Sequence, residues 1–269
     1  MGVLDLIKIL AVGDVFGAPG CNFVKKHLRK IINAEGADFV IVNGENACGG
    51  NGLDRAEADL IFSSGADVIT GGNHSFRRYA LMDFIEDEPR ILRPLNFPVG
   101  SPGEGFCIVP VKNGLRAMVI SVCGQVFMDP ADSPFTAVNR LLESQKGKYD
   151  IAICDFHGEA TSEKLAFAHE FDGRIQIIYG THTHVQTADE RLTPRGGGYI
   201  SDIGMVGSED SVIGISYETA VPRFTRNVRM KGIPAAENVS LRGAVFTLDE
   251  KTLYCTDVKR INYNEEDLK

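Results

Sequence analysis

The sequence predicts an α/β fold, because short apolar runs rich in β-branched residues alternate with segments of helical periodicity. Runs of this kind are typical of strands buried in a mostly parallel sheet. Two later pairs of runs are joined by tight turns, which adds antiparallel strands to the parallel ones. We therefore expect two packed sheets rather than one.

Five apolar runs are expected to form buried strands, at residues 6–12, 39–42, 68–70, 151–154 and 175–179. Each run leads into carboxylate, amide or imidazole side chains. These side chains belong to Asp14, Glu45, Asn46, Asn73, His74, Asp155, His157, His182 and His184. Because ligands of open α/β sheets bind outside the carboxyl ends of the strands, the sequence predicts a polar site at one edge of the sheet.

Three segments have the apolar spacing of helices, at residues 22–33, 55–64 and 78–86. His27 lies among the basic residues of the first segment, so it is expected to be solvated on the helix surface. His169 is also expected on a helix, either at the surface or in a packing contact.

Two hairpins are expected in the second half of the chain. Runs at 106–109 and 116–120 flank Asn113-Gly114, a dipeptide that favours tight hairpin turns. The second hairpin lies within residues 243–258. Residues 222–239 are polar, with prolines and repeated arginines, and are expected to form a long excursion over the surface.

The composition is that of an ordinary globular protein, and we expect a single domain over residues 1–269. No apolar stretch approaches the roughly 20 residues of a membrane-spanning helix. The first six residues lack the basic region of a secretory signal, so a cytoplasmic location is expected. The formal net charge of -8 disfavours binding to long nucleic acid, which requires a basic surface.

The six cysteines are scattered and form no C-x-x-C pair. They are Cys21, Cys48, Cys107, Cys123, Cys154 and Cys255. We expect reduced core residues rather than disulfides or a zinc cluster, and no thiolate ligation of a metal.

His182 and His184 form the strongest single indication of a metal site. In an extended backbone, residues two apart point to the same side and lie about 6.6 Å apart along the strand. The two imidazoles could therefore converge on one ion or on two neighbouring ions.

Five motifs, taken in order, resemble those of a known superfamily. They are Gly13-Asp14, Gly44-Glu45-Asn46, Gly72-Asn73-His74, Asp155-Phe156-His157-Gly158-Glu159 and Gly180-Thr181-His182-Thr183-His184. The chain resembles the calcineurin-like metallophosphoesterases, and most closely their YmdB-like bacterial branch. The resemblance extends from Asp14 to Gly214 and covers most of the chain.

The resemblance implies a four-layered α/β/β/α sandwich and a dinuclear metal centre that hydrolyses phosphodiesters, with cyclic nucleotides as substrates. It implies that Asp14 and His184 hold one ion, with Asn46 completing the shell. The ligands implied for the other ion are Asn73, His157 and His182. Glu45 would bridge the two ions.

Two positions depart from the wider superfamily. Its usual Asp-x-His is Asp14-Val15-Phe16 here, and its usual bridging aspartate is Glu45, as in the YmdB-like branch.

Two divalent ions would carry four positive charges, and the carboxylates of Asp14 and Glu45 would balance only two of them. The surplus could hold a bridging hydroxide and a phosphodiester oxygen. His74 is expected to act as a general acid or hydrogen-bond donor rather than as a ligand.

We therefore expect a dinuclear metal-dependent phosphodiesterase acting on small nucleotide phosphodiesters, with 2′,3′-cyclic nucleotides preferred and a metal-bound hydroxide as nucleophile. Ligands of oxygen and nitrogen suit iron or manganese, with zinc as an alternative. A regulatory or scaffolding protein that keeps the metal site with little or no turnover is the main rival. A metal-free Rossmann nucleotide binder is disfavoured because the G-x-G-x-x-G order is missing.

Several roles stay open at this point. Asp155 could orient a metal ligand or make only structural hydrogen bonds. Arg77 and Arg78 could hold a phosphate or form a solvated start of a helix. Association of several copies of the chain is also left open.

Overall fold

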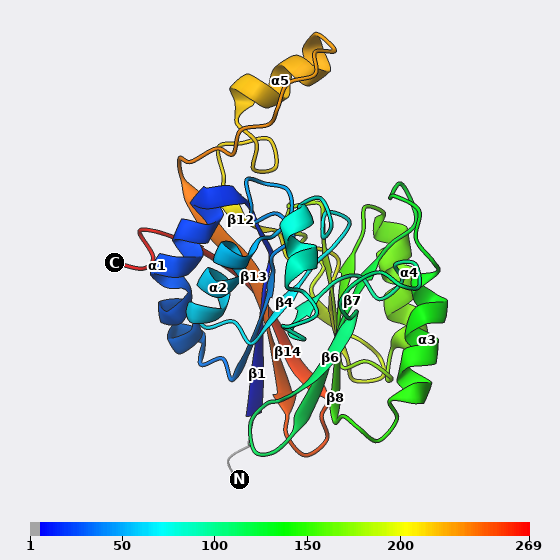
Figure 1. Cartoon of the computed structure of the whole chain (residues 1–269). Coiled ribbons are helices and arrows are strands. Elements are labelled where there is room, and N and C mark those ends of the chain that lie inside the picture. The colour runs from blue at the N-terminus through cyan, green and yellow to red at the C-terminus, as the bar shows by residue number, and fades with distance from the viewer. Residues whose placement is uncertain (1–5) are drawn as a thin grey trace.

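The computed structural model describes residues 6–269, and its strands form two mixed sheets (Figure 1). The strands of the first sheet are β1 (Leu6–Val12), β2 (Asp14–Val15), β3 (Phe39–Asn43), β4 (Val68–Thr70), β5 (Ile91–Leu92), β12 (Met205–Ser208), β13 (Val239–Asp249) and β14 (Cys255–Asn264). Their order is β2-β12-β13-β1-β3-β4-β5, and β14 pairs with β13. Strands β1, β3, β4 and β5 are parallel, whereas β13 runs antiparallel to β1.

The second sheet has the order β10-β11-β9-β8-β7-β6. Its strands are β6 (Phe106–Pro110), β7 (Arg116–Cys123), β8 (Ile151–His157), β9 (Ile177–Thr181), β10 (Arg191–Leu192) and β11 (Gly198–Ile200). The parallel strands β7, β8, β9 and β11 form its centre. The parallel strands of both sheets therefore supply the carboxyl ends at which the polar motifs lie.

Helices cover the outer face of each sheet (Figure 1). These helices are α1 (Gly17–Glu35), α2 (Arg55–Ser63), α3 (Pro134–Ser144) and α4 (Thr161–Phe171). A further helix, α5 (Tyr217–Thr225), lies apart from the sheets, and a short 3-10 helix, η1 (Tyr79–Asp83), follows β4. Helices α1 and α2 pack on the first sheet, and α3 and α4 pack on the second. Within the described residues 6–269, no helix is both long and apolar enough to cross a membrane.

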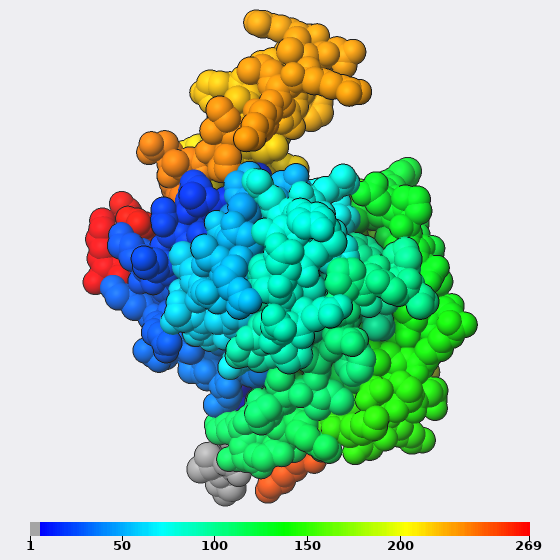
Figure 2. Space-filling model, in the orientation of Figure 1, coloured from blue at the N-terminus to red at the C-terminus, as the bar shows by residue number. Residues whose placement is uncertain are grey.

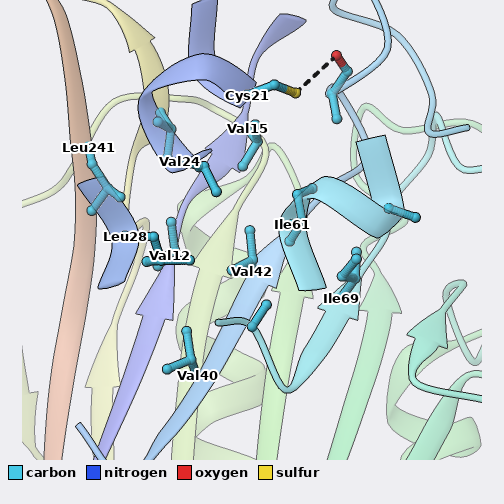
Figure 3. Close-up of a cluster of buried hydrophobic side chains, with 14 of the residues drawn as sticks. Val12, Val15, Cys21, Val24, Leu28, Val40, Val42, Ile61, Ile69 and Leu241 are labelled. Atoms are coloured by element: carbon cyan, nitrogen blue, oxygen red, sulfur yellow. Dashed lines mark hydrogen bonds between the residues drawn. The ribbon is translucent and has the colours of Figure 1, made fainter. Parts of the chain in front are cut away.

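Three apolar clusters separate the layers. Leu10 and Val12 of β1 point into the cluster beneath α1 and α2, which Figure 3 shows. Ile9 and Ala11, the alternate residues of the same strand, point into the cluster between the two sheets. A third cluster lies between the second sheet and helices α3 and α4. The layers confirm the predicted α/β/β/α sandwich.

The predicted strands and hairpins are all present, with ends shifted by a few residues. The hairpin of β6 and β7 turns at Asn113 and Gly114, whose φ angles of 56° and 81° are both positive. Two positive φ angles match the twist of the flanking strands, which is why this dipeptide was informative. The second hairpin consists of β13 and β14. All six cysteines are free thiols, and five of them are buried.

Two predictions from helical spacing are wrong. Residues 78–86 form η1 and turns rather than an α-helix, although the buried side chains Leu81, Phe84 and Ile85 follow the expected spacing. His27 is 4% exposed instead of solvated, because it packs on Phe23 and the C-terminal segment covers α1. Both errors arise from tertiary contacts, which local periodicity does not contain. His169 lies exposed on α4, as expected.

Residues 216–234, which we call the arm, stand away from the body of the molecule (Figure 1, Figure 2). The arm confirms the predicted surface excursion, but it begins with α5, which was not predicted because Pro222 lies inside the helix. A bridge between Ile215 and Pro234 closes its base. The expectation that the first six residues are not a secretory signal falls mostly on residues 1–5, which lie outside the described part of the chain.

Glu35 at the end of α1 ties this helix to β14. Its carboxylate accepts hydrogen bonds from Lys259 Nζ at 2.8 and 2.9 Å and from the Tyr263 hydroxyl. Burial opposes ionisation of Glu35, but these hydrogen bonds outweigh it and lower the pKa of the carboxyl below 4.5. The contribution to stability is therefore complete above pH 4.5 and is lost as the pH falls through the lowered pKa of the folded protein.

Replacing the Glu35 carboxylate tests the contribution of these hydrogen bonds to stability. We expect Glu35→Gln to reduce the free energy of unfolding by about 1 kcal/mol at pH 7, with the difference from the original chain narrowing at acidic pH. Urea unfolding across a pH series measures it. Glu265→Gln is the matched control, because the Glu265–Lys26 ion pair is exposed and contributes little. A difference that stays constant down to the acid limit would contradict the assigned role.

Candidate metal centre

The carboxyl ends of five strands bring all eight predicted site residues into one connected group. Asp14 follows β1, Glu45 and Asn46 follow β3, Asn73 and His74 follow β4, His157 ends β8, and His182 and His184 follow β9. Seven of the eight residues form two neighbouring sets of donor atoms, held together by side-chain contacts. The eighth residue, His74, lies beside both sets. The site therefore lies at the edge where the two sheets meet.

The first set centres on Nε2 of His157. This atom lies 2.9 Å from Oδ1 of Asn73, 3.1 Å from Nδ1 of His182 and 3.1 Å from Oε1 of Glu45. The His157 side chain is completely buried, whereas His182 is partly exposed. Three oxygen or nitrogen atoms thus crowd around one imidazole nitrogen.

The second set contains Asp14, His184 and Asn46. The Asn46 amide nitrogen lies 3.1 Å from Nε2 of His184 and 3.4 Å from Oδ1 of Asp14. Nε2 of His184 lies 3.6 Å from the same carboxylate oxygen. Nδ1 of His184 is held by the Ile213 carbonyl at 2.8 Å, which directs Nε2 toward the site.

Glu45 connects the two sets through one oxygen. Its Oε1 lies 3.1 Å from the His157 nitrogen and also accepts a hydrogen bond from the Asn46 amide at 3.1 Å. The other oxygen, Oε2, accepts from the backbone N–H of His74 at 3.0 Å. Consecutive Glu45 and Asn46 both face the site because the chain leaves β3 at Gly44 and turns.

Thr181 and Asp155 fix the orientation of His157. The Thr181 hydroxyl donates to Asp155 Oδ1 at 2.6 Å, so it must accept from Nδ1–H of His157 at 2.9 Å. Burial raises the pKa of Asp155 to about 6, which leaves it ionised at neutral pH. Nε2 of His157 consequently faces the other donor atoms. Asp155 therefore contacts His157 through Thr181, an arrangement that agrees with an orienting role.

The buried charges of this group suit a cation. Burial disfavours a charged imidazole, yet the buried carboxylate of Glu45 raises the pKa of His157 to about 9. Burial and the neighbouring His157 lower the pKa of His182 to about 3. The Glu45 carboxylate, the Asn73 amide oxygen and Nδ1 of His182 all face His157 Nε2, and a proton or a metal ion there would make the contacts attractive. The donor chemistry fits a metal ion.

His182 and His184 reach the site for a reason that differs from the prediction. Strand β9 ends at Thr181, so the two histidines are not extended neighbours; their φ angles are 98° and 65°. Positive φ is costly for residues other than glycine and commonly occurs where function requires it. The turn, rather than alternation along a strand, directs the two imidazoles to different donor sets.

A buried ion pair that the sequence did not indicate holds this turn. Lys164 Nζ donates to Asp202 at 3.0 Å and to the Thr181 carbonyl at 2.9 Å. The same Asp202 oxygen accepts from the backbone N–H and the hydroxyl of Thr183, between the two histidines. Neither residue lies in a recognisable motif, which explains why both were missed.

Gly72 makes room for the donor atoms. A Cβ atom at this position would lie 2.3 Å from Oε2 of Glu45 and 2.4 Å from Nε2 of His157.

Asn43 is a further residue of the site that was not predicted. Its side chain accepts a hydrogen bond from the backbone N–H of Glu45 and donates one to Asp155. Its position one residue before Gly44-Glu45 was the available signal.

Comparison with known proteins identifies the family. The sequence model of the YmdB-like protein family matches residues 10–261. The chain belongs to this family. Over 260 residues, this YmdB-like chain is 40% identical to the 2′,3′-cyclic-nucleotide 2′-phosphodiesterase of Bacillus subtilis (strain 168), covering 97% of the chain and 98% of that relative.

Solved structures agree with this assignment of the YmdB-like chain. A crystal structure of a novel phosphatase from Mycoplasma pneumoniae superposes with a TM-score of 0.91 at 32% identity, covering 97% of the chain and 95% of that structure. A hypothetical protein from Thermus thermophilus gives a TM-score of 0.89 at 36% identity, covering 96% of the chain and 99% of that structure. The predicted family, the metallophosphoesterase fold and the prediction of an enzyme are confirmed.

The strained backbone of this YmdB-like protein can be tested at His182. We expect His182→Gly to be more stable than His182→Ala by about 1 kcal/mol, because only glycine adopts the positive φ without strain. Urea unfolding of chelator-treated proteins measures the difference. Both variants lack the imidazole, so each serves as the control for the other. An alanine variant as stable as the glycine variant would show that the turn is not strained.

Proposed function

We propose that this YmdB-like protein is a dinuclear metal-dependent phosphodiesterase that hydrolyses small nucleotide phosphodiesters, with 2′,3′-cyclic nucleotides as the preferred substrates. The observation that carries the proposal is the convergence of two sets of oxygen and nitrogen donors joined by Glu45 Oε1. The name of the Bacillus subtilis relative supports this choice of substrate. Residues 1–269 would form a single domain of this kind.

The donor sets suggest how the ions would be divided. Asp14 and His184 would hold one ion, with Asn46 completing its shell, and Glu45 would bridge to the second. The ligands of the second ion would be Asn73, His157 and His182. Two divalent ions bound there would supply positive charge for the phosphoryl oxygens and activate the attacking water. The absence of sulfur among these donors favours iron or manganese, with zinc as the alternative.

The Asn46 amide links the second donor set to His74. Its Oδ1 lies 2.8 Å from Nδ1 of His74, while Nδ2 faces Asp14 and His184. A ligand role would require the oxygen to face the ion, so the amide would have to be turned over, with its N–H groups facing His74. His74 Nδ1 would accept that hydrogen bond, which leaves the proton on Nε2. The exposed edge of the ring would therefore present an N–H to the leaving oxygen as a hydrogen-bond donor, and a general-acid role would require a second proton on Nδ1.

The decisive experiment compares turnover with metal content. Metal-loaded protein should hydrolyse bis-p-nitrophenyl phosphate and 2′,3′-cyclic AMP, and His74→Ala should lower kcat by roughly 100-fold while keeping the same metal stoichiometry. Elemental analysis of each preparation controls for metal loss. If loaded protein turns over neither substrate, the regulatory or scaffolding alternative replaces the enzymatic proposal.

A second test concerns the hydrogen bonds that orient His157. Thr181→Val keeps the volume of the side chain but removes the acceptor for His157 Nδ1 and the donor to Asp155. We expect metal affinity to fall by about 10–100-fold, measured by competition with a chelating dye. Thr256→Val is the control, because the Thr256 hydroxyl donates to the Thr247 carbonyl and contacts no expected ligand. Equal losses in both variants would rule out a specific role for Thr181.

Two further parts of the proposal concern the setting of the enzyme. Free thiols fit a cytoplasmic location, where cysteines stay reduced. Self-association is supported by large apolar side chains exposed on the arm. They are Tyr217, Val221, Phe224, Val228, Met230 and Ile233. Contiguous exposed apolar side chains commonly mark sites of protein association.

A further inference from the structure

A basic cavity of about 370 Å³ adjoins the candidate metal centre. The body of the protein contributes His74 and Arg78 to its lining, and the arm contributes Arg223 and Lys231. His74 also borders the donor sets of the metal centre, with Nδ1 3.4 Å from Oε1 of Glu45. The cavity therefore opens directly from the place where the scissile phosphodiester would lie.

Three of the cations that line this cavity lack an acidic partner. Among residues 6–269, no carboxylate lies within ion-pair distance of Arg78, Arg223 or Lys231. Arg77 also lines the cavity but pairs with Asp129 at 2.9 Å. Like charges gathered without counterions repel one another, so an anion bound among them would be stabilised.

Arg223 is positioned by the arm itself. Its Nη2 donates to the Met230 carbonyl at 2.7 Å, which joins α5 to the segment of the arm that leads back to the body. Its Nε is buried without a hydrogen-bond partner within the described chain. A Cβ atom at Gly232 would lie 2.9 Å from Nη2, so glycine there leaves space for the guanidinium. A buried donor without a partner is costly, and an anionic ligand would satisfy it.

Arg78 is held from the opposite side by a glycine-rich loop. Its Nε and Nη2 donate to the carbonyls of Asn51 and Cys48 at 3.2 and 3.3 Å. A Cβ atom at Gly52 would lie 2.4 Å from the Arg78 side chain, so a larger residue would displace it. Arg78 lies exposed at the start of η1, as one of the two alternatives expected, but these hydrogen bonds fix the position of its guanidinium.

The charge of the arm contrasts with that of the whole chain. Residues 216–234 contain four basic residues and one acidic residue, whereas the chain has a formal net charge of -8. Arg226 and Arg229 belong to the same arm but do not line the cavity. The unpaired cations at the cavity are thus a local feature of an otherwise acidic protein.

We propose that this cavity binds a second phosphoryl group of the substrate, so that the enzyme prefers nucleotides carrying a phosphate in addition to the scissile phosphodiester. Arginine is well suited to the role because its planar group binds phosphate through two hydrogen bonds. The second phosphate could be a terminal 5′-phosphate or an internal phosphodiester of a short oligoribonucleotide. The inference rests on the proposed function for the position of the scissile group.

Kinetics with three substrates test this preference. They are 2′,3′-cyclic AMP, its 5′-phosphorylated form, and an adenosine dinucleotide ending in a 2′,3′-cyclic phosphate. A second phosphate should raise kcat/KM by roughly tenfold or more, since each charge-assisted hydrogen bond contributes about that factor. A gain confined to the 5′-phosphorylated mononucleotide identifies the terminal phosphate, whereas a gain confined to the dinucleotide identifies the internal one.

Variants of the arm identify the residues responsible. Arg223→Ala should bring the ratio of kcat/KM with the second phosphate to kcat/KM without it close to one. Lys231→Ala should also lower this ratio. This second variant keeps the test valid if Arg223→Ala fails to fold. Arg229→Ala removes the same charge from the arm outside the cavity and should leave the ratio unchanged. A ratio lowered equally by Arg229→Ala would overturn the assignment to this cavity.

A binding measurement separates this inference from the proposed function. Calorimetry should show adenosine 3′,5′-bisphosphate binding roughly tenfold more tightly than 3′-AMP, with the difference lost in Arg223→Ala. If the protein hydrolyses 2′,3′-cyclic AMP but neither ratio exceeds one, the inference is overturned and the phosphodiesterase proposal stands. If there is no hydrolysis yet the bisphosphate binds more tightly, the cavity assignment stands and the catalytic proposal fails.

Discussion

The contact between the Glu45 carboxylate and Nε2 of His157 is the constraint on which the site depends. Both groups are buried, and the lone pairs of Asn73 and His182 face the same point. A proton or a metal ion at this point would make the contacts attractive, so the fold presents a candidate cation site. The neighbouring residues hold the donor atoms of Glu45, His157, Asn73 and His182 in place.

The surrounding residues fix the donors from behind rather than adding further ligands. Thr181 holds the far nitrogen of His157, Asn43 holds the backbone of Glu45, and Gly72 supplies the space between them. These groups come from strands of two different sheets, so the geometry depends on how the sheets pack. The apolar cluster between the sheets therefore contributes to function as well as to stability.

The sequence predicted which polar residues come together, because chemistry-bearing residues at strand ends must meet at one edge of a parallel sheet. It did not predict how His182 and His184 are aimed, since a turn with positive φ replaces the expected strand. It also missed Lys164 and Asp202, whose pairing joins residues distant in sequence. His27 and η1 show the same limitation: spacing identifies which residues face the core, but long-range packing decides burial and the type of helix.

The separation of the basic arm from the donor sets has a physical consequence. A metal centre built from buried groups must be rigid, because displaced ligands weaken both metal binding and catalysis. Cations that select among substrates are subject to a different requirement, since they must release a charged product. The arm meets it by placing Arg223 and Lys231 on a protruding segment, whereas every ligand candidate lies at the sheet edge. Because loops vary more readily than sheets, substrate preference could change through the arm while the metal centre is retained.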